Sequence, residues 1–287
     1  NERTYVVLSG LNENMPEAMK LFEKLMADAQ VNKEAYTNMV ADILKSRKDA
    51  KLNQMQNFRR LMNYGMYGPK SPATNILTET ELQTMDPQEL TDRIHNQNSY
   101  KHRIMYYGPT SEKELLAIIN KNHQAPKKLK EIPVGNEFPR LETPVTKVLI
   151  SPYEAKQIYM TQLSNRGEKF DPMIEPSRQM YNEYFGGGMN SIVFQEMRES
   201  RGLAYSAWAG LNRPSYSKYP YLLQTQIATQ NDKMIDAIKV FNDIIDNMPE
   251  SEAAFQLAKE ALIARLRTER ITKSDIIWSY INAQDLG

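Results

Sequence analysis

Two side chains that could assist peptide chemistry stand on either side of a glycine in the segment GGGMNSIVFQEMRESRGLAYSAW, residues 186–208. Arg198 falls in the last turn of an expected helix, and Tyr205 opens an expected strand after Gly202. Glycine readily adopts the left-handed conformation that ends many helices, so this turn can fold the two side chains toward one another. A guanidinium and a phenol that converge form a donor pair suited to a peptide carbonyl or its oxyanion.

The same two residues also have an ordinary structural interpretation. Arg198 has Glu196, Glu199 and Arg201 as neighbours and could be one more solvated charge on a helix. Tyr205 could be a strand aromatic whose hydroxyl faces water. The spacing alone leaves both interpretations open.

Flanking residues predict the elements that would hold this pair. Met189, Val193 and Met197 follow the i, i+4, i+8 spacing of a buried helix face. Along AYSAWAGL, Tyr205, Ala207 and Ala209 share one strand face because side chains alternate. The two small alanines are expected to leave room for a peptide backbone beside the phenol.

The glycine run itself is a second candidate site. Gly187 and Gly188 precede a helix, whose N-terminus can hold an anion. No Gly-Lys-Ser/Thr follows, and the dinucleotide fingerprint is not matched, so neither kind of nucleotide loop is predicted.

Composition narrows the class of protein. The 287 residues leave room for about two domains, and 41% hydrophobic with 25% charged residues is typical of globular proteins. A net charge of +1 favours neither nucleic acid nor an anionic membrane as partner, and no run is long enough to span a bilayer. The absence of cysteine excludes disulfides, thiolate ligands and a cysteine nucleophile, and fits a bacterial envelope protein as well as a cytosolic one. The chain begins with Asn1, not methionine, and we expect its natural N-terminus upstream.

No metal site is predicted. None of the three histidines, His95, His102 and His123, belongs to an H-E-x-x-H or H-x-x-E-H motif, so structural or solvated roles are expected for them. No G-x-S-x-G nucleophile elbow is present either, so the chain alone lacks a visible catalytic centre.

Hydrophobic periodicity and capping signals predict alternating strands and helices. Helix starts are expected at Asn14-Met15-Pro16 and at the capping boxes Thr78/Glu81 and Ser111/Glu114. One long helical pattern runs from about residue 32 to 64, another helix follows Asp86-Pro87, and one runs from Asp171-Pro172 to Phe185. Two closing helices start near residues 231 and 250, and strands are expected at 4–9, 100–107, 147–151, 157–164, 204–211 and 221–229.

An internal repeat relates the two ends of the chain. A shift of 219 positions brings Met15 onto Met234, Phe22 onto Phe241 and Gly68 onto Gly287. This predicts the same strand, helix, helix arrangement in residues 4–68 and 223–287, and a duplicated unit of about 220 residues. Residues 124–146 contain four prolines and few apolar residues, which is typical of a linker between 1–123 and 147–287.

The segment YFGGGMNSIVFQEMRESRGLAYSAWAG resembles the signature of the pitrilysin/insulinase-type zinc metallopeptidases. Tyr106-Tyr107-Gly108-Pro109 resembles a strand end of that family, although the remaining similarity rests on element order. The resemblance implies an α+β fold of repeated units, each a mostly antiparallel sheet packed against helices. It places the end of one unit at residues 1–123 and the front of the next at 147–287. Arg198 and Tyr205 match the family's arginine and tyrosine, which reach the substrate from the half opposite the zinc.

The resemblance therefore implies the C-terminal portion of a hydrolase, a zinc metalloendopeptidase, that closes the chamber and positions a peptide or protein substrate. Zinc is expected in a missing N-terminal half or subunit, and this chain alone is expected to be inactive. The alternative is a catalytically inactive partner, or a purely structural subunit of the same superfamily. A bacterial periplasmic or envelope location is expected, with a mitochondrial one as the alternative.

Overall fold

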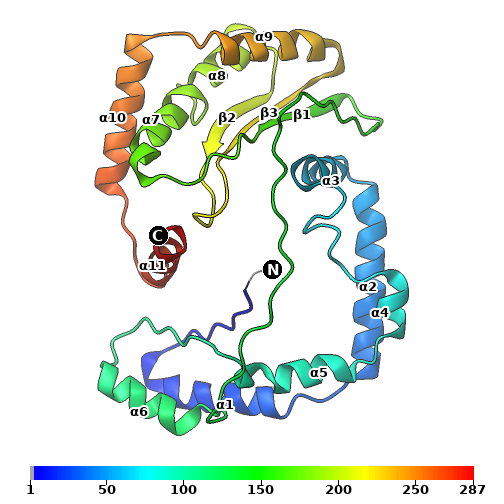
Figure 1. Cartoon of the computed structure of the whole chain (residues 1–287), viewed down its shortest axis with the longest axis vertical. Helices are drawn as coiled ribbons and strands as arrows, with labels where there is room; N and C mark the ends of the chain where they lie inside the picture. Colours follow the sequence, from blue (N-terminus) through cyan, green and yellow to red (C-terminus); the bar gives the residue numbers. More distant parts are fainter. Residues whose placement is uncertain (1–2) are drawn as a thin grey trace. The chain divides into compact units, whose positions relative to one another are not determined.

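A computed structural model describes residues 3–287 of the chain (Figure 1). The chain divides into two compact units. The first unit comprises Asn1–Asp49 and Asn75–Glu137, and the second comprises Ala50–Thr74 and Phe138–Gly287. No helix among the described residues is both long and apolar enough to cross a membrane.

The second unit is built on a three-stranded antiparallel sheet. Its strands are β1 (Gln157–Ser164), β2 (Ser206–Asn212) and β3 (Leu222–Gln230), in the spatial order β1-β3-β2. In this register Ala228 on the central strand lies opposite both Tyr159 and Ser206. The predicted strands at 157–164, 204–211 and 221–229 are confirmed to within two residues at each end.

Helices cover the face of this sheet that carries the core, and α3 packs on the other face, where Phe58 contacts Tyr159 of β1. The core residues Phe185, Val193, Met197, Ile227 and Phe241 are at most 1% exposed and come from α7, α8, the following turn, β3 and α9. Figure 1 shows α10 beside α7, and these two helices make the most extensive helix–helix contact in the unit. The helices of this unit are α3 (Gln54–Tyr67), α7 (Glu175–Phe185), α8 (Ile192–Phe194), α9 (Met234–Asp246), α10 (Glu252–Thr268) and α11 (Asp275–Leu286). The predicted α+β fold class is confirmed.

The regular elements of the first unit, over its described residues, are helices. Both predicted capping boxes are present: Thr78 caps α4 together with Glu81, and Ser111 caps α6 together with Glu114. The helices of this unit are α1 (Met15–Ala27), α2 (Lys33–Lys51), α4 (Glu79–Thr84), α5 (Gln88–His95) and α6 (Glu112–Asn122). Extended backbone pairs in this unit at the bridge between Tyr100 and Lys130.

Several predicted elements are wrong. Residues 4–9, 100–107 and 147–151 form no strand, because a strand needs a continuous ladder of backbone partners. Among the described residues these segments have only the single bridge between Tyr100 and Lys130. The long helix predicted at 32–64 is two helices, α2 and α3, since Asn53 caps the second by accepting a hydrogen bond from Gln56 N at 3.0 Å. Three helices close the chain, where two were predicted.

The helical part of the predicted repeat is confirmed. The helices α1 and α9 begin 219 positions apart, at Met15 and Met234, and each has 13 residues. The helices α2 and α10 begin at Lys33 and Glu252, with the same offset. The strand of the repeat exists only as β3, because residues 4–9 form none.

The two helix pairs also share their capping details. Ala35 N donates to Asn32 Oδ1 at 2.9 Å, and 219 positions later Ala254 N donates to Ser251 Oγ at 3.2 Å. Gly68 and Gly287 end α3 and α11 with positive φ angles of 73° and 99°.

The two compact units do not coincide with the repeated segments of the sequence. Residues 50–74 belong to the second unit, and the boundary after Glu137 falls inside the irregular segment 124–146. The assignment of residues 1–123 to the end of one repeated family unit and of residues 147–287 to the front of the next remains a prediction.

Candidate functional site

The site begins where α7 ends against the sheet. A Cβ on Gly186 would lie 2.2 Å from Ala209 O and 2.5 Å from Ala209 N, so only glycine lets the chain pass this close to β2. Two residues further along β2, Leu211 N donates to the side-chain amide of Asn182 at 2.8 Å, and the same amide donates to Leu211 O at 3.1 Å. The end of α7 and the glycine turn therefore cover part of the outer edge of β2.

The helical segment that carries Arg198 is short and tightly packed. Ser191 caps α8, accepting a hydrogen bond from Phe194 N, and the chain continues as a π-helical turn, Gln195–Ser200. Val193 and Met197 are fully buried, as their spacing predicts. Met189 is 73% exposed because it precedes the cap and is not part of the helix, so its predicted place on the buried stripe is wrong.

A glycine turn joins this segment to β2, as predicted. Gly202 has a φ of 56°, and its N–H donates to Arg198 O at 3.0 Å. Leu203 N and Ala204 N both donate to Met197 O, and Lys233 Nζ donates to Gly202 O at 3.0 Å. These bonds satisfy the last carbonyls of the helix and fix the direction of the chain into β2.

This turn brings Arg198 and Tyr205 together. The Arg198 guanidinium carbon lies 5.9 Å from the centre of the Tyr205 ring and 5.1 Å from the centre of the Phe194 ring. Tyr205 is 74% exposed, and the Arg198 side chain is 48% exposed. The two side chains thus share one open surface, and their donor groups remain accessible to a ligand.

Two neighbours that the sequence did not single out complete the surroundings of Arg198. Phe194 stands four residues before it and supports the guanidinium by a cation–π contact, a spacing readable from the helix pattern. Glu199 Oε1 lies 3.6 Å from Arg198 Nε, and both side chains are about half exposed. An ion pair this open is worth at most about 1 kcal/mol, so it restrains Arg198 only weakly.

The space predicted beside the phenol is already filled. Ala207 and Ala209 are 8% and 3% exposed and belong to the hydrophobic core. Their small side chains admit the protein's own helices, and Gly186 takes the place next to Ala209. The prediction that these alanines leave room for a peptide backbone is therefore wrong, and the open surface lies at Tyr205 itself.

Gly187 and Gly188 lie apart from the donor pair along the same segment. Both are exposed and precede the cap at Ser191, whereas Arg198 lies in the last turn of the helical segment. A Cβ on Gly187 would lie 2.6 Å from Asn182 O, but one on Gly188 would meet nothing closer than 4.0 Å. Close packing against Asn182 O therefore explains why position 187 holds a glycine. The substrate-binding role of Gly187 and Gly188 remains a prediction.

A carboxylate that the sequence analysis missed anchors the other end of α7. Glu175 receives Arg178 Nε at 2.9 Å and the Tyr221 hydroxyl at 2.9 Å, and Arg178 Nη1 donates to Leu211 O at 3.0 Å. Burial opposes the charge of Glu175, but these hydrogen bonds and the charges of Arg178 and Arg213 hold its pKa below the usual value. Burial raises the pKa of Tyr181, on the same helix, to about 12, so it stays neutral.

The described residues do not fit a zinc site. Within residues 3–287 no three His, Cys, Asp or Glu side chains are placed to hold a metal ion. His102 and His123 meet through their Nε2 atoms at 2.9 Å, and His123 Nδ1 lies 2.6 Å from Glu23 Oε1. His102 Nδ1 contacts Tyr100 O at 2.7 Å, so all four ring nitrogens are engaged in hydrogen bonds. This group is a hydrogen-bonded chain between α1, α6 and the segment after Ser99, as expected for structural histidines.

Comparisons with known proteins agree on one family. The model of the family described as "Peptidase M16 inactive domain" matches residues 103–262, which include Arg198 and Tyr205. Uncharacterized zinc proteases of Mycobacterium tuberculosis and Mycobacterium bovis are 34% identical over 80 residues, which is 27% of this chain but only 18% of their length.

Two solved structures share the fold. The peptidase M16 inactive domain of Pseudomonas fluorescens aligns with 96% of this chain and 65% of its own, at 14% identity and a TM-score of 0.61. The periplasmic protease PqqL of Escherichia coli aligns with 95% of this chain and 31% of its own, at 13% identity and a TM-score of 0.70.

Proposed function

The chain belongs to the family of peptidase M16 inactive domains, and we propose that it forms the non-zinc-binding part of a zinc metalloendopeptidase. Domains of this type are homologous to the C-terminal halves of pitrilysin/insulinase-type proteases, and the chain's relatives include zinc proteases. The chain spans less than a fifth of those relatives' length. In our proposal the zinc, its ligands and the general base lie outside this chain, which closes the chamber and positions the peptide.

The observation that carries the proposal is the meeting of Arg198 and Tyr205. The guanidinium carbon lies 5.9 Å from the centre of the Tyr205 ring, and both side chains are exposed, which supports a role for the two groups at one surface. Arg198 belongs to the π-helical turn Gln195–Ser200. This supports the interpretation, since π-helical turns are frequent at functional sites.

The chemistry of the pair suits a peptide carbonyl. The guanidinium has several N–H donors in a fixed plane, and the phenol has one rotatable O–H donor. Both can bind the carbonyl oxygen of a substrate and hold the negative charge that develops on it during attack. Neither group needs to transfer a proton, so their role is to position and stabilise.

The partners that follow are a peptide or protein substrate and a zinc-bearing half, either in the same chain or as a separate subunit. An H-x-x-E-H motif upstream in the same reading frame would place both halves in one chain. We also propose a bacterial periplasmic or envelope location. Cell fractionation with an antibody to this chain tests that location, and recovery from the cytosol or from mitochondria would contradict it.

The first experiment asks whether the chain acts alone. A fluorogenic peptide is incubated with the purified chain, with and without zinc and a chelator. We expect no cleavage that the chelator abolishes, because the described residues offer no ligand set. Chelator-sensitive cleavage by the 287-residue chain would overturn the division of labour proposed above.

The second experiment tests the donor pair in the complete enzyme. Arg198→Ala and Tyr205→Phe should each lower kcat by about a hundredfold or more, the usual loss when one oxyanion donor is removed. Tyr205→Phe is the sharper variant, since it deletes one hydroxyl and keeps the ring. Arg201→Ala is the matched control because Arg201 has the same side-chain exposure, 48%, and its own partner, Glu196.

The outcomes separate the proposal from its rivals. Unchanged thermal stability with reduced kcat in Arg198→Ala and Tyr205→Phe, but not in Arg201→Ala, supports substrate positioning. Wild-type turnover by Tyr205→Phe would leave the tyrosine a packing residue and the role with Arg198 alone. Wild-type turnover by both variants would favour the alternative, an inactive or purely structural subunit.

A further inference from the structure

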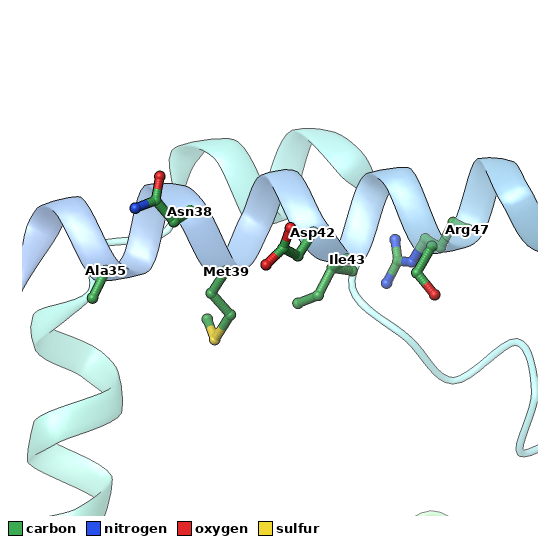
Figure 2. Close-up of a pocket in the computed structure, with 7 residues that line it drawn as sticks. Ala35, Asn38, Met39, Asp42, Ile43 and Arg47 are labelled. Atoms are coloured by element: carbon green, nitrogen blue, oxygen red, sulfur yellow. The ribbon is translucent and has the colours of Figure 1, made fainter.

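The helix α2 carries two apolar stripes, and this unit covers only one of them. Along the first, Val40 is 7% exposed and the Tyr36 hydroxyl donates to Leu82 O of α4 at 2.6 Å. Along the second, Ala35, Met39 and Ile43 point to one side of the helix and line a shallow pocket (Figure 2). We call Ala35, Met39 and Ile43 the α2 stripe; Ala35 is exposed, Met39 is 42% exposed and Ile43 is half-buried.

The repeat gives each residue of the α2 stripe a counterpart in α10. A shift of 219 positions brings Ala35 onto Ala254, Met39 onto Ala258 and Ile43 onto Leu262. The helices begin at the same offset and are capped by the same type of hydrogen bond at Asn32 and Ser251. The α2 stripe is therefore the same face of the same helix, one repeat earlier.

In the second unit this face is covered by α7. Ala258 and Leu262 are 7% and 9% exposed, and Ala254 packs against the core. Glu183 of α7 forms an ion pair with Arg265 at 2.7 Å. The Tyr184 hydroxyl, also on α7, donates to Pro249 O and accepts from Ser251 N, which fixes α7 at the start of α10.

We propose that the α2 stripe binds an amphipathic α-helix that lies on α2 as α7 lies on α10. The same shift of 219 positions places such a helix about 35 to 45 residues upstream of Asn1, in the sequence that precedes this chain in a longer protein. Its contact face would carry large apolar side chains to fill the space over Ala35 and Ile43. Asp42 and Arg47 line the same pocket, so the contact face would also carry a basic side chain toward Asp42 and an acidic one toward Arg47. This inference does not depend on Arg198 or Tyr205.

The absence of cysteine from the chain allows a direct test. Met39→Cys on the α2 stripe and Lys48→Cys on the opposite, exposed side of α2 are each made in two proteins. One is the 287-residue chain, and the other is extended upstream in its own reading frame by about 60 residues, enough to include the shifted α7. Ala35→Cys serves as a second variant on the stripe if Met39→Cys does not fold.

The rate at which these thiols react with a maleimide shows whether the α2 stripe is covered. We expect Met39→Cys to react at least about tenfold more slowly in the extended protein than in the shorter one, because covered sites react only through local opening. Lys48→Cys should react equally in both. A benzophenone maleimide attached to the thiol of the Met39→Cys variant should then crosslink to the segment about 35 to 45 residues upstream of Asn1.

Any of four results would overturn the proposal. One is equal labelling of Met39→Cys in the two proteins. Another is protection in the 287-residue chain that grows with protein concentration, which would identify a second copy as the occupant. The third is a crosslink to any other segment. The fourth is an upstream frame that encodes no amphipathic helix at that distance.

Discussion

The helices α1 and α9 are the same element in two different surroundings. Both have 13 residues, both follow a short 3-10 turn, and they begin 219 positions apart. In α9, Ala237 and Phe241 are fully buried and Ile244 is 2% exposed. Their counterparts in α1 are Ala18, which is exposed, Phe22, which is half-buried, and Leu25, which is 63% exposed.

The difference shows which forces act at which level. Helix bounds depend on capping and on residues within one or two turns, so the repeat conserves them in both units. Burial of the helix face depends on a sheet and a neighbouring helix, and only the second unit has the sheet among the described residues. The matching apolar patterns of α1 and α9 therefore contribute different amounts to the free energy of unfolding, because only the face of α9 is buried.

The largest expected effect tests that inequality at the paired phenylalanines. Phe241→Ala should lower the free energy of unfolding by about 3–5 kcal/mol, the cost of emptying a fully buried aromatic site, whereas Phe22→Ala should cost about 1 kcal/mol. Urea denaturation of each variant measures the loss. Similar losses at both positions would mean that Phe22 is covered as completely as Phe241.

A second change removes the close contact that places α7 in the second unit. Gly186→Ala should destabilise by about 2–3 kcal/mol, because its Cβ would overlap Ala209 O and the backbone must shift. Gly188→Ala is the matched control and should cost less than about 0.5 kcal/mol, since nothing lies closer than 4.0 Å. If this backbone shift loosens α7, Ala258 of α10 should become accessible. A cysteine at that position, added to the Gly186→Ala variant by Ala258→Cys, should then react with a maleimide, as a cysteine on the exposed α2 stripe does.

A third change acts on the start of α7 and depends on pH. Glu175→Gln should cost about 1.5 kcal/mol at pH 7, through loss of charged hydrogen bonds to Arg178 and Tyr221. Since folding lowers the pKa of Glu175 below its usual 4.5, its contribution is complete above pH 4.5 and is lost as pH falls through the folded-state pKa. Unfolding free energies of both proteins from pH 7 to about pH 3 should therefore converge. A constant difference across that range would contradict this account.

The smallest effect is expected to be equal in the two units. Asn32→Ala and Ser251→Ala should each destabilise their helix by about 1 kcal/mol, because each removes one capping hydrogen bond to the residue three positions later. Hydrogen exchange in the first turns of α2 and α10 measures this locally. Clearly unequal effects would show that tertiary cover, and not the local bond, sets the stability of these helix starts.

Several features followed from the sequence because they are local. Thr78 and Glu81, and Ser111 and Glu114, form the predicted capping boxes, and Gly202 adopts the predicted left-handed turn. The convergence of Arg198 and Tyr205 also followed, since a turn of a few residues joins them. Short-range geometry and hydrogen bonding decide each of these features.

Tertiary structure decided what depends on partners distant in the sequence. The apolar segment 4–9 has the pattern of a strand but, among the described residues, no strand beside it, so it does not become one. Ala207 and Ala209 look like an open platform in the sequence, yet α7 and Gly186 occupy the space around them. The sequence alone determined the capped helix starts at Thr78 and Ser111 and which two donors meet. Packing between distant segments determined which faces are covered and which stay open, because burial is a property of both surfaces in contact.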